Sequence, residues 1–87
     1  MALSTQQIIE RGFIDVHVRV SGIRQCHRLS VVKENTAFGQ INCLYSRVDI
    51  PSSELLRVTE ELSLPIKTPK TIVFPRGRGP ADFVVVQ

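Results

Sequence analysis

FIDVHVRVSGIRQCHRLSVVK, residues 13–33, largely alternates apolar and polar side chains and is interrupted once, at Ser21-Gly22. A period of two is typical of half-buried β-strands, and a small residue followed by glycine between two such runs is typical of a hairpin turn. We therefore predict strands at residues 13–20 and 23–33, joined by a two-residue turn.

The two-residue turn places Val20 opposite Ile23 and sets every other pair of the hairpin. A turn one residue longer would move Leu29 and Val31 to the polar side, because a slip of one residue exchanges the two faces of a strand. The two-residue register is therefore favoured. Its polar face consists of Asp15, His17, Arg19, Arg24, Cys26, Arg28 and Ser30.

A short helix is expected before the hairpin, at residues 3–11. Ser4 can cap it, Gln7 stands three residues later as in a capping box, and Gly12 follows the last turn. The remaining predicted elements are a strand at 40–48, a helix that follows Pro51 with Ser52 or Ser53 as its cap and that Pro65 ends, and strands at 70–74 and 82–87.

This order of elements predicts one α+β domain over residues 1–87. Two architectures fit: a small antiparallel sheet covered by the helices, or an OB-like five-stranded barrel with a helix between strands three and four. The pattern does not choose between them. The last strand is apolar at successive positions, so we expect it to be central in the sheet or paired across a homodimer interface.

Length and composition favour a small protein without an enclosed active site. The chain has 87 residues, of which 43% are hydrophobic, and a core of this size leaves little room for a large cavity. Its two cysteines do not form a disulfide framework, and no apolar run approaches the ~20 residues that cross a bilayer. We expect a cytoplasmic protein that does not enter membranes.

The charge is unevenly distributed along the chain. Residues 12–33 carry four basic side chains and one acidic one, residues 34–64 carry five acidic and two basic, and residues 65–87 carry four basic and one acidic. Two basic ends therefore flank an acidic middle. Such a division can create a basic face that attracts phosphates, or it can hold the domain or a dimer together.

Arg19 and Arg24 face each other in the predicted hairpin, and Asp15 faces Arg28. Like charges directly opposite each other destabilise a strand pair, and a phosphate or a partner's carboxylate would relieve that repulsion. The alternative is that the two long side chains extend into water while Asp15 neutralises Arg28. The hairpin is thus the first candidate site for an anionic partner.

The segment Pro75–Pro80, PRGRGP, is the second candidate. Its glycines allow a close approach to the backbone, and Arg76 and Arg78 supply positive charge suited to nucleic-acid phosphates or an acidic protein surface. A plain connection between strands is the alternative. Because no helix follows and the motif lacks the lysine of a phosphate-binding loop, nucleotide hydrolysis is not supported.

Metal binding and catalysis have weaker support. Cys26 and His27 are neighbours on a strand and point to opposite faces, so they cannot chelate one ion together. We interpret His27 as half-buried and hydrogen-bonded, and Cys26 and Cys43 as small apolar side chains. His17 opposite Cys26 is the one pair of reactive types. We expect no metal, no cofactor and no enzymatic activity.

The sequence therefore predicts a small, non-catalytic domain that binds macromolecules, with contact to the nucleic-acid backbone as the favoured mode. The alternative is a protein-interaction or oligomeric accessory subunit in which residues 83–86 form an intersubunit edge. The small number of aromatic residues argues against sequence-specific binding of single strands. The candidate phosphate contacts are Arg19, Arg24, Arg28, Arg76 and Arg78.

Overall fold

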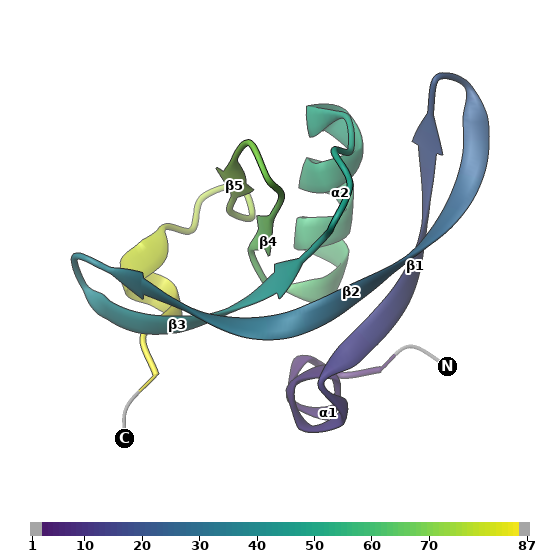
Figure 1. Cartoon of the computed structure of the whole chain (residues 1–87). Coiled ribbons are helices and arrows are strands. Elements are labelled where there is room, and N and C mark those ends of the chain that lie inside the picture. The colour runs from purple at the N-terminus through teal and green to yellow at the C-terminus, as the bar shows by residue number, and fades with distance from the viewer. Residues whose placement is uncertain (1–2, 86–87) are drawn as a thin grey trace.

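Five strands form one open sheet in which they lie side by side in chain order (Figure 1). The computed structural model describes residues 3–85. The predicted α+β class is confirmed, whereas the sheet is open rather than closed into a barrel and mixed rather than antiparallel. The elements are α1 (Thr5–Arg11), β1 (Phe13–Val20), β2 (Ile23–Thr36), β3 (Gly39–Tyr45), α2 (Ser52–Leu62), β4 (Ile66–Lys67), β5 (Ile72–Val73) and the 3₁₀ helix η1 (Pro80–Phe83).

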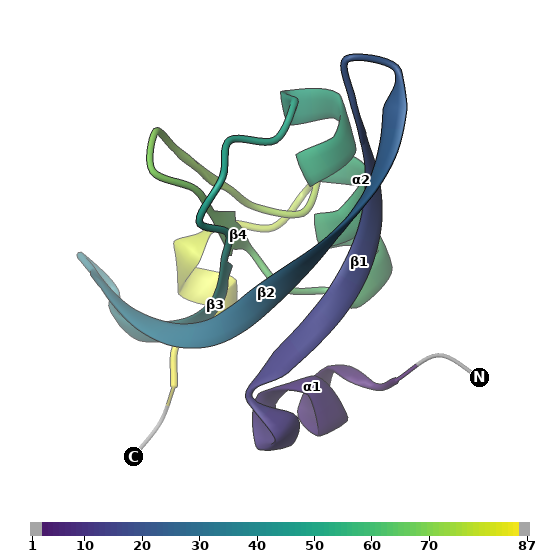
Figure 2. The same cartoon turned by 45° about the vertical axis from the view of Figure 1, so that its right-hand side comes forward.

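The β1–β2 hairpin has the predicted register. Val20 pairs with Ile23 across a turn in which Ser21 has φ 54° and Gly22 has φ 78°. Two successive positive φ angles are those of a type I′ turn, whose twist matches the right-handed twist of the flanking strands. The hairpin end projects beyond the rest of the domain in both views (Figures 1 and 2).

Helix α1 has the predicted cap and the predicted end, but it begins at Thr5 rather than at residue 3. The Ser4 hydroxyl accepts from the Gln7 backbone N–H at 3.2 Å, and the Gln7 side chain accepts from the Ser4 N–H at 2.8 Å. Gly12 adopts the left-handed conformation and donates to the Ile8 carbonyl. Ile8 is fully buried and Ile9 also packs against the core, so this short helix is held by apolar contacts and by a complete capping box.

Helix α2 returns the chain between β3 and β4, which therefore run parallel. A helical crossover is the usual way to connect parallel neighbours, and this is why the antiparallel prediction fails at β4. The predicted Ser52 or Ser53 cap is also wrong, because Pro51 occupies the N-cap position and no side chain caps the helix. The helix ends at Leu62, ahead of Pro65, with Ser63 in the left-handed conformation.

The C-terminal segment differs most from the prediction. Residues 82–87 do not form a strand in the part that the structure describes: η1 ends at Phe83, and Val84 forms a single bridge to Ile41 on the edge of β3. The Val85 N–H donates to the Gln40 carbonyl at 2.7 Å. This segment is therefore peripheral rather than central, and residues 86–87 lie outside the described range.

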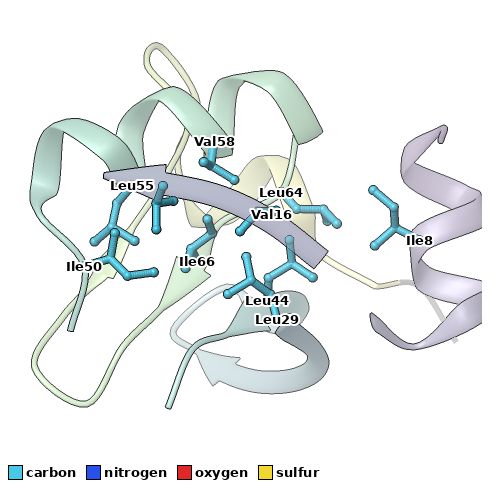
Figure 3. Packing of buried hydrophobic residues seen from close by; sticks show 10 residues of the cluster. Ile8, Val16, Leu29, Leu44, Ile50, Leu55, Val58, Leu64 and Ile66 are labelled. Carbon is cyan, nitrogen blue, oxygen red and sulfur yellow. The ribbon is translucent and has the colours of Figure 1, made fainter. Parts of the chain in front are cut away.

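The core lies between the sheet and α2 (Figure 3). Val16 and Val18 of β1 and Leu29 of β2 point towards the helix, because alternate residues of a strand share one face. Ile8 of α1 closes the end of the core nearest that helix (Figure 3). The fully or nearly buried members are Ile8, Val16, Val18, Leu29, Leu44, Ile50, Leu55, Val58, Leu64 and Ile66.

Candidate nucleic-acid interface

The side chains of the hairpin that alternate with the core residues form a separate surface, which we call the outer face. It lies on the side of β1 and β2 away from α2. All of its members are exposed except Phe13, which is half-buried. The outer face consists of Phe13, Asp15, His17, Arg19, Arg24, Cys26, Arg28 and Ser30.

Phe13 and Asp15 organise the end of the outer face nearest α1. The guanidinium carbon of Arg28 lies 4.3 Å from the Phe13 ring centroid, and that of Arg11 lies 4.6 Å away. Arg28 also donates to both Asp15 carboxylate oxygens, at 2.9 and 3.2 Å, and this hydrogen bonding lowers the pKa of Asp15. Arg28 is thus held by a ring and a carboxylate, while Arg11 brings an additional positive charge from α1.

Arg19 and Arg24 form the other end, where they are direct cross-strand partners. Within residues 3–85 neither guanidinium forms an ion pair or a side-chain hydrogen bond. Their repulsion is therefore not relieved by a salt bridge of their own. They line a shallow hollow of about 290 Å³ together with His17, Val18, Glu54 and Arg57.

Two side chains of α2 reach the free edge of β1 beside this hollow. Glu54 Oε1 accepts from the Arg19 backbone N–H at 2.6 Å, and Arg57 donates to the His17 carbonyl at 2.8 Å. Arg57 also pairs with Glu54 at 3.3 Å, and this is the main cause that lowers the pKa of Glu54. Glu54 and Arg57 thus hydrogen-bond a backbone N–H and a carbonyl of β1 that could otherwise pair with a strand of another chain. The pair therefore protects the edge of the sheet.

Arg76 and Arg78 are not brought to the outer face. Arg76 lies 3.7 Å from Glu60 on α2, and Arg78 stacks over the Phe83 ring at 4.4 Å and lines a hollow with Ser63, which follows α2. Both therefore lie on the side of the sheet that α2 covers. The five predicted arginines divide into a hairpin group of three and a separate pair.

The histidines and cysteines do not converge on a site. His27 is half-buried and hydrogen-bonded to Gln25 at 2.9 Å, as predicted. Cys43 is buried, and burial raises the pKa of its thiol to about 11, whereas Cys26 is exposed on the outer face and does not behave as an apolar core residue. Among residues 3–85 no three His, Cys, Asp or Glu side chains are placed to hold a metal ion.

Sequence reasoning missed several residues that shape this surface. Glu54 and Arg57 lie 35 and 40 residues from their partners on β1, so no local pattern signals their contacts. The contribution of Arg11 could have been found from the sequence, because it stands two residues before the first strand and next to Gly12, which ends the helix.

Comparison of the chain with protein-family models, with curated proteins and with solved structures finds no match. Within the described residues, no helix is long and apolar enough to span a membrane.

Proposed function

We propose that this domain binds nucleic acid through backbone phosphates, using the outer face of the β1–β2 hairpin together with Arg11. The observation that carries the proposal is the pairing of Arg19 with Arg24, two exposed cations directly opposite each other. Each can donate two parallel hydrogen bonds to a phosphate, and a phosphate between them would replace repulsion by attraction.

The charge of the surrounding surface supports the same partner. The outer face and Arg11 together present four guanidinium groups and one carboxylate, and that carboxylate, Asp15, is already engaged by Arg28. Glu54 lines the same hollow and its charge acts on Arg19, but its oxygens are bonded to the Arg19 backbone and to Arg57, whose positive charge balances it. A net positive potential therefore remains over the hairpin.

The test is a pair of double variants with the same change in composition. Arg19→Ala with Arg24→Ala removes two charges from the outer face, and Arg76→Ala with Arg78→Ala removes two from the other side of the sheet. Binding of a labelled random-sequence oligonucleotide is measured at several salt concentrations between about 50 and 200 mM.

The hairpin variant should bind more weakly, with its log-log salt slope reduced by roughly 1.4 to 1.8, because each lost phosphate contact lowers that slope by roughly 0.7 to 0.9. The control variant should retain the parent slope. Equal losses in the two variants would show that net charge matters and the outer face does not. A parent that does not bind at low salt would refute the proposal.

A second candidate function, interaction with another protein or a second copy of the chain, has one observation in its favour. Phe38 in the β2–β3 turn is 61% exposed, and Val84 is 38% exposed. Val84 lies against Gly39, the residue after Phe38, since a Cβ on Gly39 would lie 3.4 Å from a Val84 methyl group. The two side chains thus form an exposed apolar end of the domain. Light scattering of the parent and of Phe38→Ser tests it: a dimer that the substitution dissociates supports this function.

A further inference from the structure

The three longest strands bring two aromatic side chains into one row. Phe13 pairs with Ser30, and Ser30 pairs with Tyr45, so the three side chains lie on the same side of the sheet. Adjacent strands are ~4.8 Å apart, which places the two aromatic residues roughly 10 Å apart with a small side chain between them. This row extends the outer face onto β3.

The position of Tyr45 leaves its hydroxyl available. Leu44 is fully buried in the core beneath α2, so Tyr45, the next residue of the strand, points to the opposite side. Tyr45 is half-buried, and within residues 3–85 its hydroxyl has no hydrogen bond. In the same part of the chain no buried side-chain oxygen or nitrogen lacks a partner, so this hydroxyl is open to solvent. The same is true of the exposed Ser30 hydroxyl.

The other end of the row combines an aromatic ring with guanidinium groups. Arg11 and Arg28 both lie over Phe13, and the Arg28 side chain is 62% exposed. Guanidinium planes and aromatic rings are the two kinds of side chain on which unstacked bases of single strands stack. Bases within a duplex cannot use such a platform, because they are already stacked on one another.

We propose that the partner of the outer face is single-stranded RNA, with one base on Tyr45 and one on the Phe13–Arg28 pair. The strand then continues along the hairpin, so that phosphates further on reach Arg19 and Arg24, roughly 20 Å from Phe13. The Ser30 and Tyr45 hydroxyls lie where they can bond a ribose 2′-hydroxyl, which DNA lacks. This inference rests on the proposed function, and it adds the strandedness and the sugar of the partner.

Tyr45 itself provides a direct readout. It is the single tyrosine of a chain without tryptophan, so the intrinsic fluorescence of the unmodified protein reports on this residue alone. Titration with oligouridylate should quench that fluorescence, because a base stacks on the ring. Free tyrosine titrated in the same way corrects for absorption by the RNA. Saturable binding by anisotropy without quenching would overturn the placement of Tyr45.

Variants and ligands then separate the parts of the inference. Tyr45→Leu should weaken oligouridylate binding about ten-fold, within the range of one lost base–aromatic stack, while Tyr45→Phe keeps the ring and most of the affinity. A Tyr45→Leu variant that binds as tightly as the parent would overturn the stacking role. The fluorescence of the parent tests the same contact if Tyr45→Leu does not fold.

The same oligonucleotide as DNA, and as an RNA duplex with its complement, should bind more weakly than the RNA single strand. DNA bound as tightly as RNA would overturn the RNA assignment, and a duplex bound as tightly would overturn single-strand binding. In both of these cases the proposed phosphate binding stands. Phosphate binding itself fails if no nucleic acid is bound at low salt, so the two failures are distinguishable.

Discussion

Arg19 on β1 and Arg24 on β2 stand directly opposite each other on the outer face of the hairpin. The repulsion between the two arginines destabilises the fold, whereas the same pair is proposed to bind phosphate. One substitution should therefore increase stability and weaken binding. We expect Arg24→Thr to raise the free energy of unfolding by about 0.5 kcal/mol, because it removes a like-charge pair and introduces a good strand former. Urea denaturation measures the stability, and the anisotropy assay measures the loss of binding.

The matched control is Lys33→Thr, which removes an exposed cation of β2 that faces Asn42 rather than another charge. It should not show the same gain. A loss of stability in Arg24→Thr would mean that the arginine pair is held by contacts within the domain rather than by a ligand.

Glu54 should make the fold sensitive to acid. Arg57 and the Arg19 N–H lower its pKa, so the ionised carboxylate stabilises the folded state above the ordinary glutamate value of ~4.3, and this contribution is lost as the pH falls through the folded pKa. Glu54→Gln should therefore lower the melting temperature at neutral pH, with the difference from the parent vanishing in strong acid. Thermal melts across the acid range measure it.

Glu10→Gln, on the exposed side of α1, is the control for the removal of one carboxylate. Because the Glu54–Arg57 pair covers the edge of β1, Glu54→Gln should also aggregate faster than this control. Equal melting temperatures for the Glu54 variant and the parent at neutral pH would contradict the role of the pair.

The hairpin could be predicted from sequence because a wrong register would have moved a whole row of apolar side chains to the polar face. No such constraint acts on β4, because its two residues, Ile66 and Lys67, are too few to show a period. Their pairing with β3 depends on where α2 returns the chain. The C-terminal residues 83–85 are apolar enough for a strand. However, Gly79 and Pro80 begin a 3₁₀ helix that extends to Phe83, so the first bridge to β3 forms only at Val84.

In the candidate site, too, contacts between residues close in sequence could be predicted, whereas contacts between distant segments could not. The pairing of Arg19 with Arg24 follows from the turn length alone. The alignment of Tyr45 with Phe13 requires both hairpin registers to be known, and the contact of Glu54 with β1 requires the docking of α2. The separation of Arg76 from the hairpin arginines likewise depends on that docking, because its partner Glu60 belongs to α2.

The turn at Ser21 offers a test of local strain. Its φ of 54° is a left-handed conformation that serine adopts at a cost, whereas asparagine is favoured there in two-residue hairpins. Ser21→Asn should raise the free energy of unfolding by about 0.5 kcal/mol, and the β-branched Ser21→Val should lower it. Urea denaturation distinguishes the two directions. A stabilising valine would contradict the turn geometry.

The two thiols should react at very different rates in the folded protein. Cys43 is fully buried and the pKa of its thiol is raised to about 11 by burial, so little thiolate forms near neutral pH. Cys26 is exposed. We expect iodoacetamide to label Cys26 while Cys43 reacts at the rate of unfolding, as judged by mass spectrometry of the digested protein. Rapid labelling of Cys43 without denaturant would contradict its burial.

Cys26 also reports on occupancy of the outer face, because it lies between Arg24 and Arg28 and directly opposite His17. A ligand bound over the arginines should cover this thiol. With oligouridylate at about ten times its dissociation constant, we expect alkylation of Cys26 to slow by about ten-fold, the factor by which the free protein is depleted. High salt should restore the rate, and Arg19→Ala with Arg24→Ala should abolish the protection. An unchanged rate at saturating RNA would place the bound RNA away from the outer face.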